Sequence, residues 1–230
     1  FGTAQLLSLS TSQVTAIETE DLAVLGTSQL QSLSTQQLSV LATQQFNAFG
    51  TSQLSRLTTE QWLSLGTLQL STLDDTDLQS LTTAQVGSLS TSQIGWLTTS
   101  QLTSLATSQL SSLSTQQLQA ISTLQLVGLS ADQVAALSTA QYLALSTTQI
   151  ASLSASQVSI LETADLRVLS TAQTSVLTTE QIEYLSNTQF SALTSVQLAA
   201  LLTTQIRSLL PEHLSTLDST ELAAMPTRSI

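Results

Sequence analysis

Several residue types that active sites commonly use are scarce or missing from this 230-residue chain. It has no Cys, one His, and four basic residues, all Arg, against 15 acidic ones. Without Cys there can be no disulfide, no thiol catalysis and no Cys-ligated zinc. Four scattered Arg cannot form a phosphate-binding surface, which excludes nucleic acid as a partner. One His and few carboxylates leave little for an active site, so we expect no enzyme.

Long hydrophobic runs are also missing. The apolar residues occur in runs of a few residues, whereas a transmembrane helix needs about 20 in succession. We therefore expect no membrane insertion. Ser and Thr together make up about a third of the residues, so the polar surface is expected to be mostly uncharged.

What the chain does have is an eight-residue repeat along its whole length. We number the octad so that Leu9 is position 1. Position 1 is apolar in all 29 octads and position 6 in 28, with Thr174 as the exception; position 3 is Thr in 22 and position 5 is Gln in 23. A disordered chain does not keep an apolar pattern of this length, so the repeat predicts a packed solenoid.

The octad favours one short helix per repeat. In a continuous helix, eight residues turn through about 800°, so the apolar stripe would wrap around the rod. In a strand, the odd spacings of five and three would place positions 1 and 6 on opposite faces. A Ser or Thr at position 2 and Gln at position 5, as in Ser90 and Gln93, form a capping box that starts a helix. We predict an all-α solenoid of capped helices, with a β-solenoid as the alternative.

The exceptions agree with helix starts. Pro211 stands at position 3, which would be the first helical residue, where Pro is tolerated. Each helix is expected to span six or seven residues, too few to be stable alone, so stability must come from stacking. His213 is expected to act as a capping imidazole rather than a metal ligand. Position 5 departs from Gln at Asp21, Asp77, Asp165, His213, Glu221 and Ser229.

A longer repeat of 144 residues overlies the octads. Phe46 and Phe190 are separated by this interval, as are the matching acidic octads that begin at Glu18 and Glu162. No change in composition marks a boundary, so we expect residues 1–230 to be one continuous array. Because the chain starts at Phe1 and stops at Ile230 within an octad, we expect an excerpt of a longer repeat protein or a processed subunit. Four octads carry acid at both positions 2 and 5: Glu18 with Asp21, Asp74 with Asp77, Glu162 with Asp165, and Asp218 with Glu221.

The acid pairs have two interpretations. Carboxylates cap helix N-termini well and interact favourably with the helix dipole. Alternatively, two carboxylates three residues apart could share a cation, and oxygen ligands without His or Cys would select calcium. We favour the caps; calcium is the one cofactor that the sequence suggests.

Three further features bear on binding. Trp62 and Tyr142 fall on core position 6, whereas Trp96 and Tyr184 fall on position 8 and are expected to be partly exposed. Recurrent Thr at position 3 could form a ladder of the kind found in ice-binding solenoids, but we favour a local role at the helix start, because the helix restart sets the octad spacing. The many Ser and Thr residues could also carry O-linked sugars.

The octads LSTAQ (137–141), LTTEQI (177–182) and LETADL (161–166) resemble repeats in very long bacterial surface proteins. Such proteins are often labelled adhesin-like or haem-utilisation-like. The resemblance implies an extracellular or cell-surface location, whereas a haem role would have only His213 as an axial ligand. The segment LLPEHL (209–214) is similar to turns of mesothelin- and stereocilin-type superhelices.

The leading hypothesis is a structural protein that forms a rod or filament by repeat stacking and self-association. The alternative is an adhesin stalk or binding solenoid whose exposed positions contact glycan, ice or another protein. A surface of Ser, Thr and Gln loses little by packing against copies of itself, whereas selective binding surfaces usually contain aromatic or Arg clusters. Self-association is therefore the expected partnership.

Overall fold

The computed structural model describes residues 2–226, and within them every regular element is an α-helix. There are 28 helices of four to six residues and no strand in this part of the chain. One helix stands in each octad, as the sequence predicts, and the β-solenoid alternative is wrong. Among these residues no helix is both long enough and apolar enough to cross a membrane.

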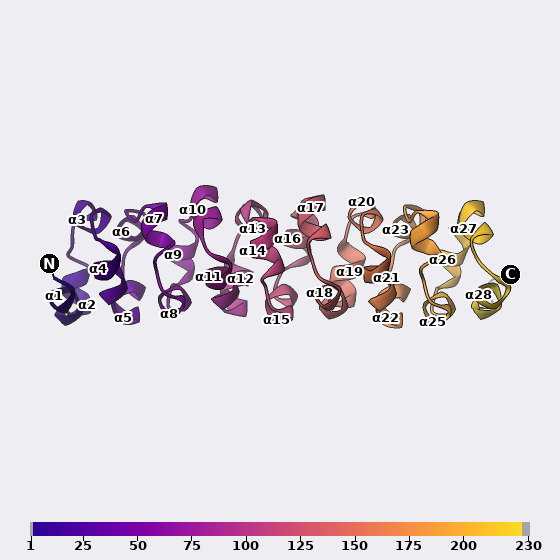
Figure 1. Ribbon diagram of the computed structural model, residues 1–230, viewed down its shortest axis with the longest axis horizontal. Coiled ribbons are helices and arrows are strands. Elements are labelled where there is room, and N and C mark those ends of the chain that lie inside the picture. Colours follow the sequence, from indigo (N-terminus) through magenta and orange to yellow (C-terminus); the bar gives the residue numbers. More distant parts are fainter. Residues whose placement is uncertain (1, 227–230) are drawn as a thin grey trace. The chain divides into compact units, whose positions relative to one another are not determined.

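The chain divides into two compact units, residues 1–120 and 121–230, which are described separately. The prediction of one continuous array therefore stays a prediction. The first unit holds these helices (Figure 1): α1 (Thr3–Ser8), α2 (Thr11–Val14), α3 (Thr19–Ala23), α4 (Thr27–Ser32), α5 (Thr35–Ser39), α6 (Thr43–Phe46), α7 (Thr51–Leu54), α8 (Thr59–Leu63), α9 (Thr67–Leu70), α10 (Asp75–Ser80), α11 (Thr83–Ser88), α12 (Thr91–Trp96), α13 (Thr99–Ser104), α14 (Thr107–Ser111) and α15 (Thr115–Gln119).

The second unit repeats the same design. Its helices are α16 (Thr123–Gly128), α17 (Ala131–Ala135), α18 (Thr139–Ala144), α19 (Thr147–Ser152), α20 (Ala155–Ser159), α21 (Thr163–Val168), α22 (Thr171–Ser175), α23 (Thr179–Glu183), α24 (Asn187–Phe190), α25 (Ser195–Ala199), α26 (Thr203–Arg207), α27 (Pro211–Ser215) and α28 (Ser219–Ala224).

Capping boxes start most of the helices, and in the longest ones an extended residue at position 1 ends the helix. In α12, the Ser90 hydroxyl accepts a hydrogen bond from the Gln93 N–H, and the Gln93 carbonyl oxygen Oε1 accepts one from the Ser90 N–H. Leu97 then has extended dihedrals (φ −60°, ψ 138°). Positions 1 and 2 thus lie outside the helix, which leaves at most six helical residues per octad, and many helices already end at position 6 or 7. Pro211 occupies the first helical position, as predicted.

Each helix packs against the helix three octads away. In the first unit α4 packs on α1 and α13 on α10; in the second, α21 packs on α18 and α24 on α21. Three octads therefore make one turn of the solenoid, a number that the octad pattern alone does not give.

The core consists of positions 1 and 6. Trp62 and Tyr142 are completely buried, whereas Trp96 and Tyr184 are 43% and 57% exposed, so both predictions are confirmed. Thr174, the single polar residue at position 6 in the described octads, is also buried, and its hydroxyl donates to the Ser170 carbonyl oxygen at 3.0 Å.

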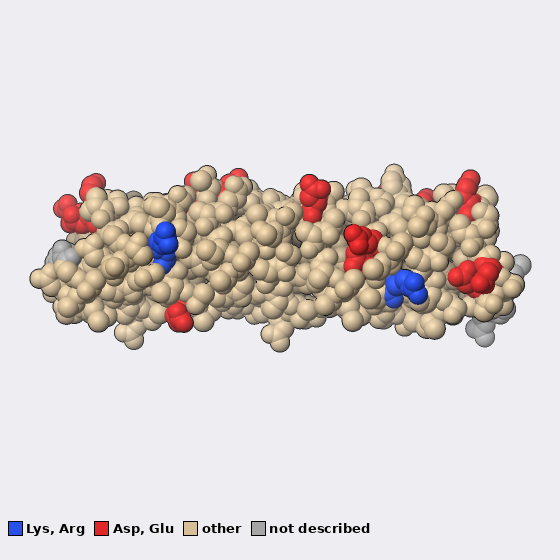
Figure 2. Space-filling view, viewed as in Figure 1, with Lys and Arg blue, Asp and Glu red and all other residues tan. Residues whose placement is uncertain are grey.

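The outer surface is mostly uncharged. Figure 2 shows a face on which acidic and basic side chains are scattered among neutral residues. Exposed Ser, Thr and Gln supply most of the polar groups at the surface.

Candidate functional site

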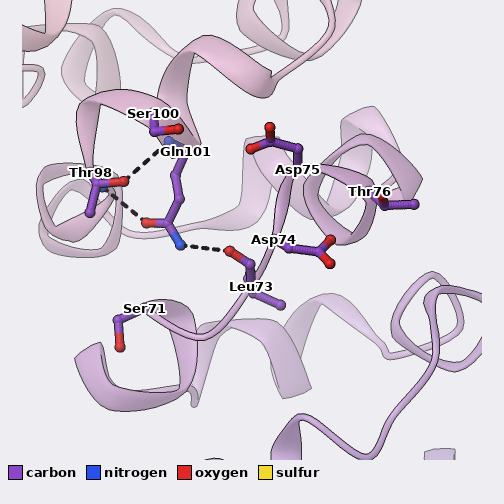
Figure 3. Close-up of a pocket in the computed structure, with 8 residues that line it drawn as sticks. All are labelled: Ser71, Leu73, Asp74, Asp75, Thr76, Thr98, Ser100 and Gln101. Carbon is purple, nitrogen blue, oxygen red and sulfur yellow. Dashed lines mark hydrogen bonds between the residues drawn. The ribbon is translucent and has the colours of Figure 1, made fainter.

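The most regular feature of the structure is a buried glutamine that joins successive turns, which we call the clamp. In α13, Gln101 Oε1 accepts from the Thr98 N–H at 3.0 Å and closes the capping box. The other end of the same amide, Nε2, donates to the carbonyl oxygens of Leu70 at 2.8 Å and Leu73 at 3.0 Å. Figure 3 shows Gln101 between Thr98 and Leu73. One side chain therefore starts its own helix and binds the end of a helix in the preceding turn.

The same geometry recurs in both units. The acceptors lie 28 and 31 residues before the glutamine, as for Gln61 with Leu33 and Leu30. In the second unit, Gln181 donates in the same way to Leu153 and Ile150. The clamp glutamines from the second turn onward are almost all buried. The fully clamped ones within a unit include Gln37, Gln45, Gln53, Gln61, Gln69, Gln85, Gln93, Gln101, Gln109 and Gln117 in the first, and Gln157, Gln173, Gln181, Gln189, Gln197 and Gln205 in the second.

The clamp solves a specific energetic problem. The position-1 carbonyl precedes a helix and has no partner within its own octad, and a buried carbonyl without a donor costs about 1–3 kcal/mol. The Gln amide provides that donor, and both its Oε1 and its Nε2 are hydrogen-bonded to the main chain. Each of these hydrogen bonds contributes about 0.5–1.5 kcal/mol net to the free energy of unfolding. The contribution recurs in every octad that has the clamp.

His213 performs the same task with a ring. Its Nδ1 accepts from the Leu210 N–H at 3.4 Å, and its Nε2 lies 2.8 Å from the Leu185 carbonyl oxygen, 28 residues earlier. The proton must therefore be on Nε2. The ring is buried and stacks on Phe190 with centroids 4.8 Å apart. The predicted capping role is confirmed, and the ring is also a clamp.

Two of the four acid pairs form complete capping boxes. Asp74 Oδ1 accepts from the Asp77 N–H at 2.8 Å, and Asp77 Oδ2 accepts from the Asp74 N–H at 3.3 Å. Asp218 and Glu221 exchange the same bonds at 2.8 and 2.9 Å. These carboxylates are used as helix caps.

The other two pairs begin with Glu, and the Glu does not cap. The side-chain carboxylates of Glu18 and Glu162 accept no hydrogen bond from the backbone N–H groups at their helix starts. Glu has one more methylene than Asp, which carries its carboxylate past the N–H groups that Asp, Ser and Thr reach. In the pair of Glu162 with Asp165, only Asp165 is buried.

The described residues contain no cluster of acidic side chains that would support calcium binding. Among residues 2–226, no three acidic or His side chains come close enough to hold a metal ion. An open groove of about 470 Å³ lies beside the Asp74 pair, and Figure 3 shows the carboxylates of Asp74 and Asp75 pointing in different directions. The calcium hypothesis for the acid pairs stays a prediction. The groove is lined by Ser71, Leu73, Asp74, Asp75, Thr76, Thr98, Ser100 and Gln101.

Acid at position 5 has a consequence that sequence reasoning missed. A carboxylate can replace the Oε1 of Gln but has no N–H to replace Nε2. Burial raises the pKa of Asp77, the Asp74 N–H lowers it, and the negative charge of Asp74 raises it further. The preference for Gln over Glu at position 5 could have revealed the need for a donor there. Both residues close a capping box, but only Gln can donate a hydrogen bond.

Comparison with known proteins identifies a repeat. Three segments match the family model of the ALTTAQ repeat: residues 14–51, 70–107 and 158–195. They cover just under half of the chain, and each begins four residues before the first acid of a pair, at Glu18, Asp74 and Glu162. No curated protein matches the chain. Each matched segment of this chain therefore carries an acid pair at the same place, and the chain is a repeat protein.

Proposed function

We propose that this chain is a structural repeat array that forms a rod or filament of a bacterial cell surface or extracellular matrix. The observation that carries the proposal is the clamp. In the octads that have it, the clamp ties the helix to the preceding turn through main-chain carbonyl groups, which every octad possesses whatever its sequence. A solenoid built on such bonds can be lengthened by adding octads.

Self-association is the second part of the proposal. The exposed side chains are mainly Ser, Thr and Gln, and charged residues make up 8% of the chain. Packing such surfaces together requires little removal of charge from water. Copies of the array, or further repeats of one chain, are therefore the proposed partners.

The extracellular location rests on the resemblance to bacterial surface repeats. The absence of Cys agrees with an oxidising environment, in which unpaired thiols would be oxidised. Immunogold labelling of the source cells with antibodies raised against the 230-residue chain tests the location. Label on the cell surface or on external fibres is expected, and label confined to the cell interior would contradict it.

Electron microscopy of the purified chain tests the structural role. Over a rising concentration series we expect fibres of uniform width, whose mass is followed by light scattering. The same series with a calcium chelator separates the two interpretations of the acid pairs, because fibres that dissolve in chelator would give the pairs a metal-binding role. Particles that stay separate at every concentration would contradict self-association.

A binding solenoid is the alternative function. The open groove beside Asp74 and Asp75 presents hydroxyls and carboxylates together, which is the chemistry that hydrogen-bonds sugar hydroxyls. A glycan array probed with the labelled chain tests this role. Selective binding that the Asp75→Ala variant loses would favour an adhesin over a rod.

A further inference from the structure

The clamp position of α21 carries an acid. Asp165 occupies the place that Gln157 and Gln173 hold in the neighbouring octads, and only 6% of it is exposed. Those glutamines donate to carbonyl oxygens 28 and 31 residues earlier, at 2.8–3.1 Å. The same offsets place Asp165 opposite the carbonyl groups of Val134 and Leu137. An ionised carboxylate cannot donate to either.

The Val134 carbonyl oxygen accepts a hydrogen bond from a different donor. Tyr142, on α18, is completely buried, and its hydroxyl donates to the Val134 carbonyl oxygen. In the described part of the second unit, no hydrogen-bond donor reaches the Leu137 carbonyl oxygen. The turn is therefore complete at Val134 and incomplete at Leu137, the carbonyl that the 28-residue offset assigns to a clamp residue at position 165.

Within the described part of the second unit, no cation offsets the buried carboxyl. The helices packed against α21 are α18 and α24; α18 contributes Tyr142 as its titratable group and α24 contributes none. On α21 and at its start, Arg167 and Glu162 are not buried. Burial raises the pKa of Asp165, the Glu162 N–H lowers it, and the Glu162 charge raises it. The pKa of Tyr142 is raised by burial first and then by the charges of Asp165 and Glu162.

We propose that Asp165 is a proton-operated joint between successive turns of the second unit. A proton taken up from solvent gives the carboxyl an O–H, which donates to the Leu137 carbonyl oxygen and completes the clamp. When the proton leaves, a carboxylate faces that carbonyl with no donor between them, and the turn depends on the Tyr142 hydroxyl. This goes beyond the proposed function, because it holds for a rod and for a binding solenoid alike.

The direction of the pH effect follows from the raised pKa. A group whose pKa is higher in the folded than in the unfolded chain stabilises the fold fully below the unfolded value, and that contribution is lost as the pH rises through the folded value. Mild acid should tighten this joint. This direction is opposite to that of ordinary acid denaturation, in which protonation removes the stabilising interactions of paired carboxylates.

Hydrogen exchange of the full 230-residue chain, read by mass spectrometry and corrected for intrinsic rates, tests the joint. In the wild type we expect protection of the amides in α18 and α21 to fall about tenfold between pH 4 and pH 7, the size of change expected when one buried hydrogen bond is lost. The Asp165→Asn variant has a donor at every pH, so its protection at these amides should not follow pH in this way.

Three further measurements keep the test decisive. Asp132→Asn removes an exposed acid on α17 in the same unit and should follow the wild type. Tyr142→Phe removes the hydroxyl that holds Val134 and should steepen the pH dependence. The infrared band of a protonated carboxyl should be present in the wild type at pH 4 and reduced in Asp165→Asn. Identical pH profiles for the wild type and Asp165→Asn would overturn the proposal, whatever the behaviour of Tyr142→Phe.

Discussion

The side-chain nitrogen Nε2 of Gln37 lies 2.8 Å from the main-chain carbonyl oxygen of Leu9, 28 residues earlier. It is equally close to the carbonyl oxygen of Leu6. Gln37 Oε1 meanwhile accepts from the Ser34 N–H at 2.8 Å. A single amide thus connects a helix start, a helix end and the residue that follows it, and the turn depends on both of its polar atoms.

Replacing Gln37 by Glu should show how much the clamp contributes. The substitution preserves size and the capping oxygen but removes both N–H donors and adds a charge beside two carbonyls. We expect the free energy of unfolding to fall by about 2–4 kcal/mol at pH 7, measured by urea unfolding followed by circular dichroism.

The adjacent residue provides a matched control. Gln36 is in the same helix, α5, but is exposed. Gln36→Glu introduces the same charge without touching the clamp, so we expect a change below about 0.5 kcal/mol. Equal losses from both variants would mean that added charge, and not the clamp, controls stability.

The sequence predicted each octad well because the information is local. The cap at Ser90, the return bond from Gln93 and the burial of positions 1 and 6 depend on residues within a few positions of one another. The partners of a clamp depend on distant residues, because every octad offers the same carbonyls and nothing in the pattern selects the octads three and four repeats earlier. The Tyr142 bond to Val134 was unpredictable for the same reason: it depends on where neighbouring octads stack.

Asp77→Gln should stabilise the first unit. The new amide would offer donors to the carbonyl oxygens of Phe46 and Phe49, which stand 31 and 28 residues earlier. We expect a gain of about 1–2 kcal/mol at pH 7, measured by urea unfolding.

The gain should also depend on pH. Since the pKa of Asp77 is raised in the folded chain, its stabilising contribution is present below the unfolded pKa and is lost as the pH rises through the folded one. The advantage of Asp77→Gln should therefore be larger at pH 7 than at pH 3. Asp75→Asn, at an exposed neighbour, removes a charge without adding a clamp and should give no such gain.

His213→Gln should leave stability nearly unchanged, within about 1 kcal/mol. Gln can make the same bonds to the Leu210 N–H and the Leu185 carbonyl oxygen that the ring makes. His213→Ala loses both bonds and the stacking on Phe190, and should cost about 2–4 kcal/mol. Thermal melts of the two variants, compared with the wild type, give the order; equal losses would show that the ring packing matters more than the clamp.

The Asp74 pair provides the sharpest test of the caps against calcium. As a cap, Asp74 can be replaced by Ser, the residue that fills this position in many other octads, with little change in stability. Asp74→Ala, which has no acceptor for the Asp77 N–H, should lose about 1 kcal/mol. Calorimetric titration of the wild type with calcium should give no binding heat, and melting should be the same with calcium or with chelator. A melting temperature that calcium raises in the wild type but not in Asp74→Ser would instead make this pair a metal site, because Ser keeps the cap and removes the carboxylate.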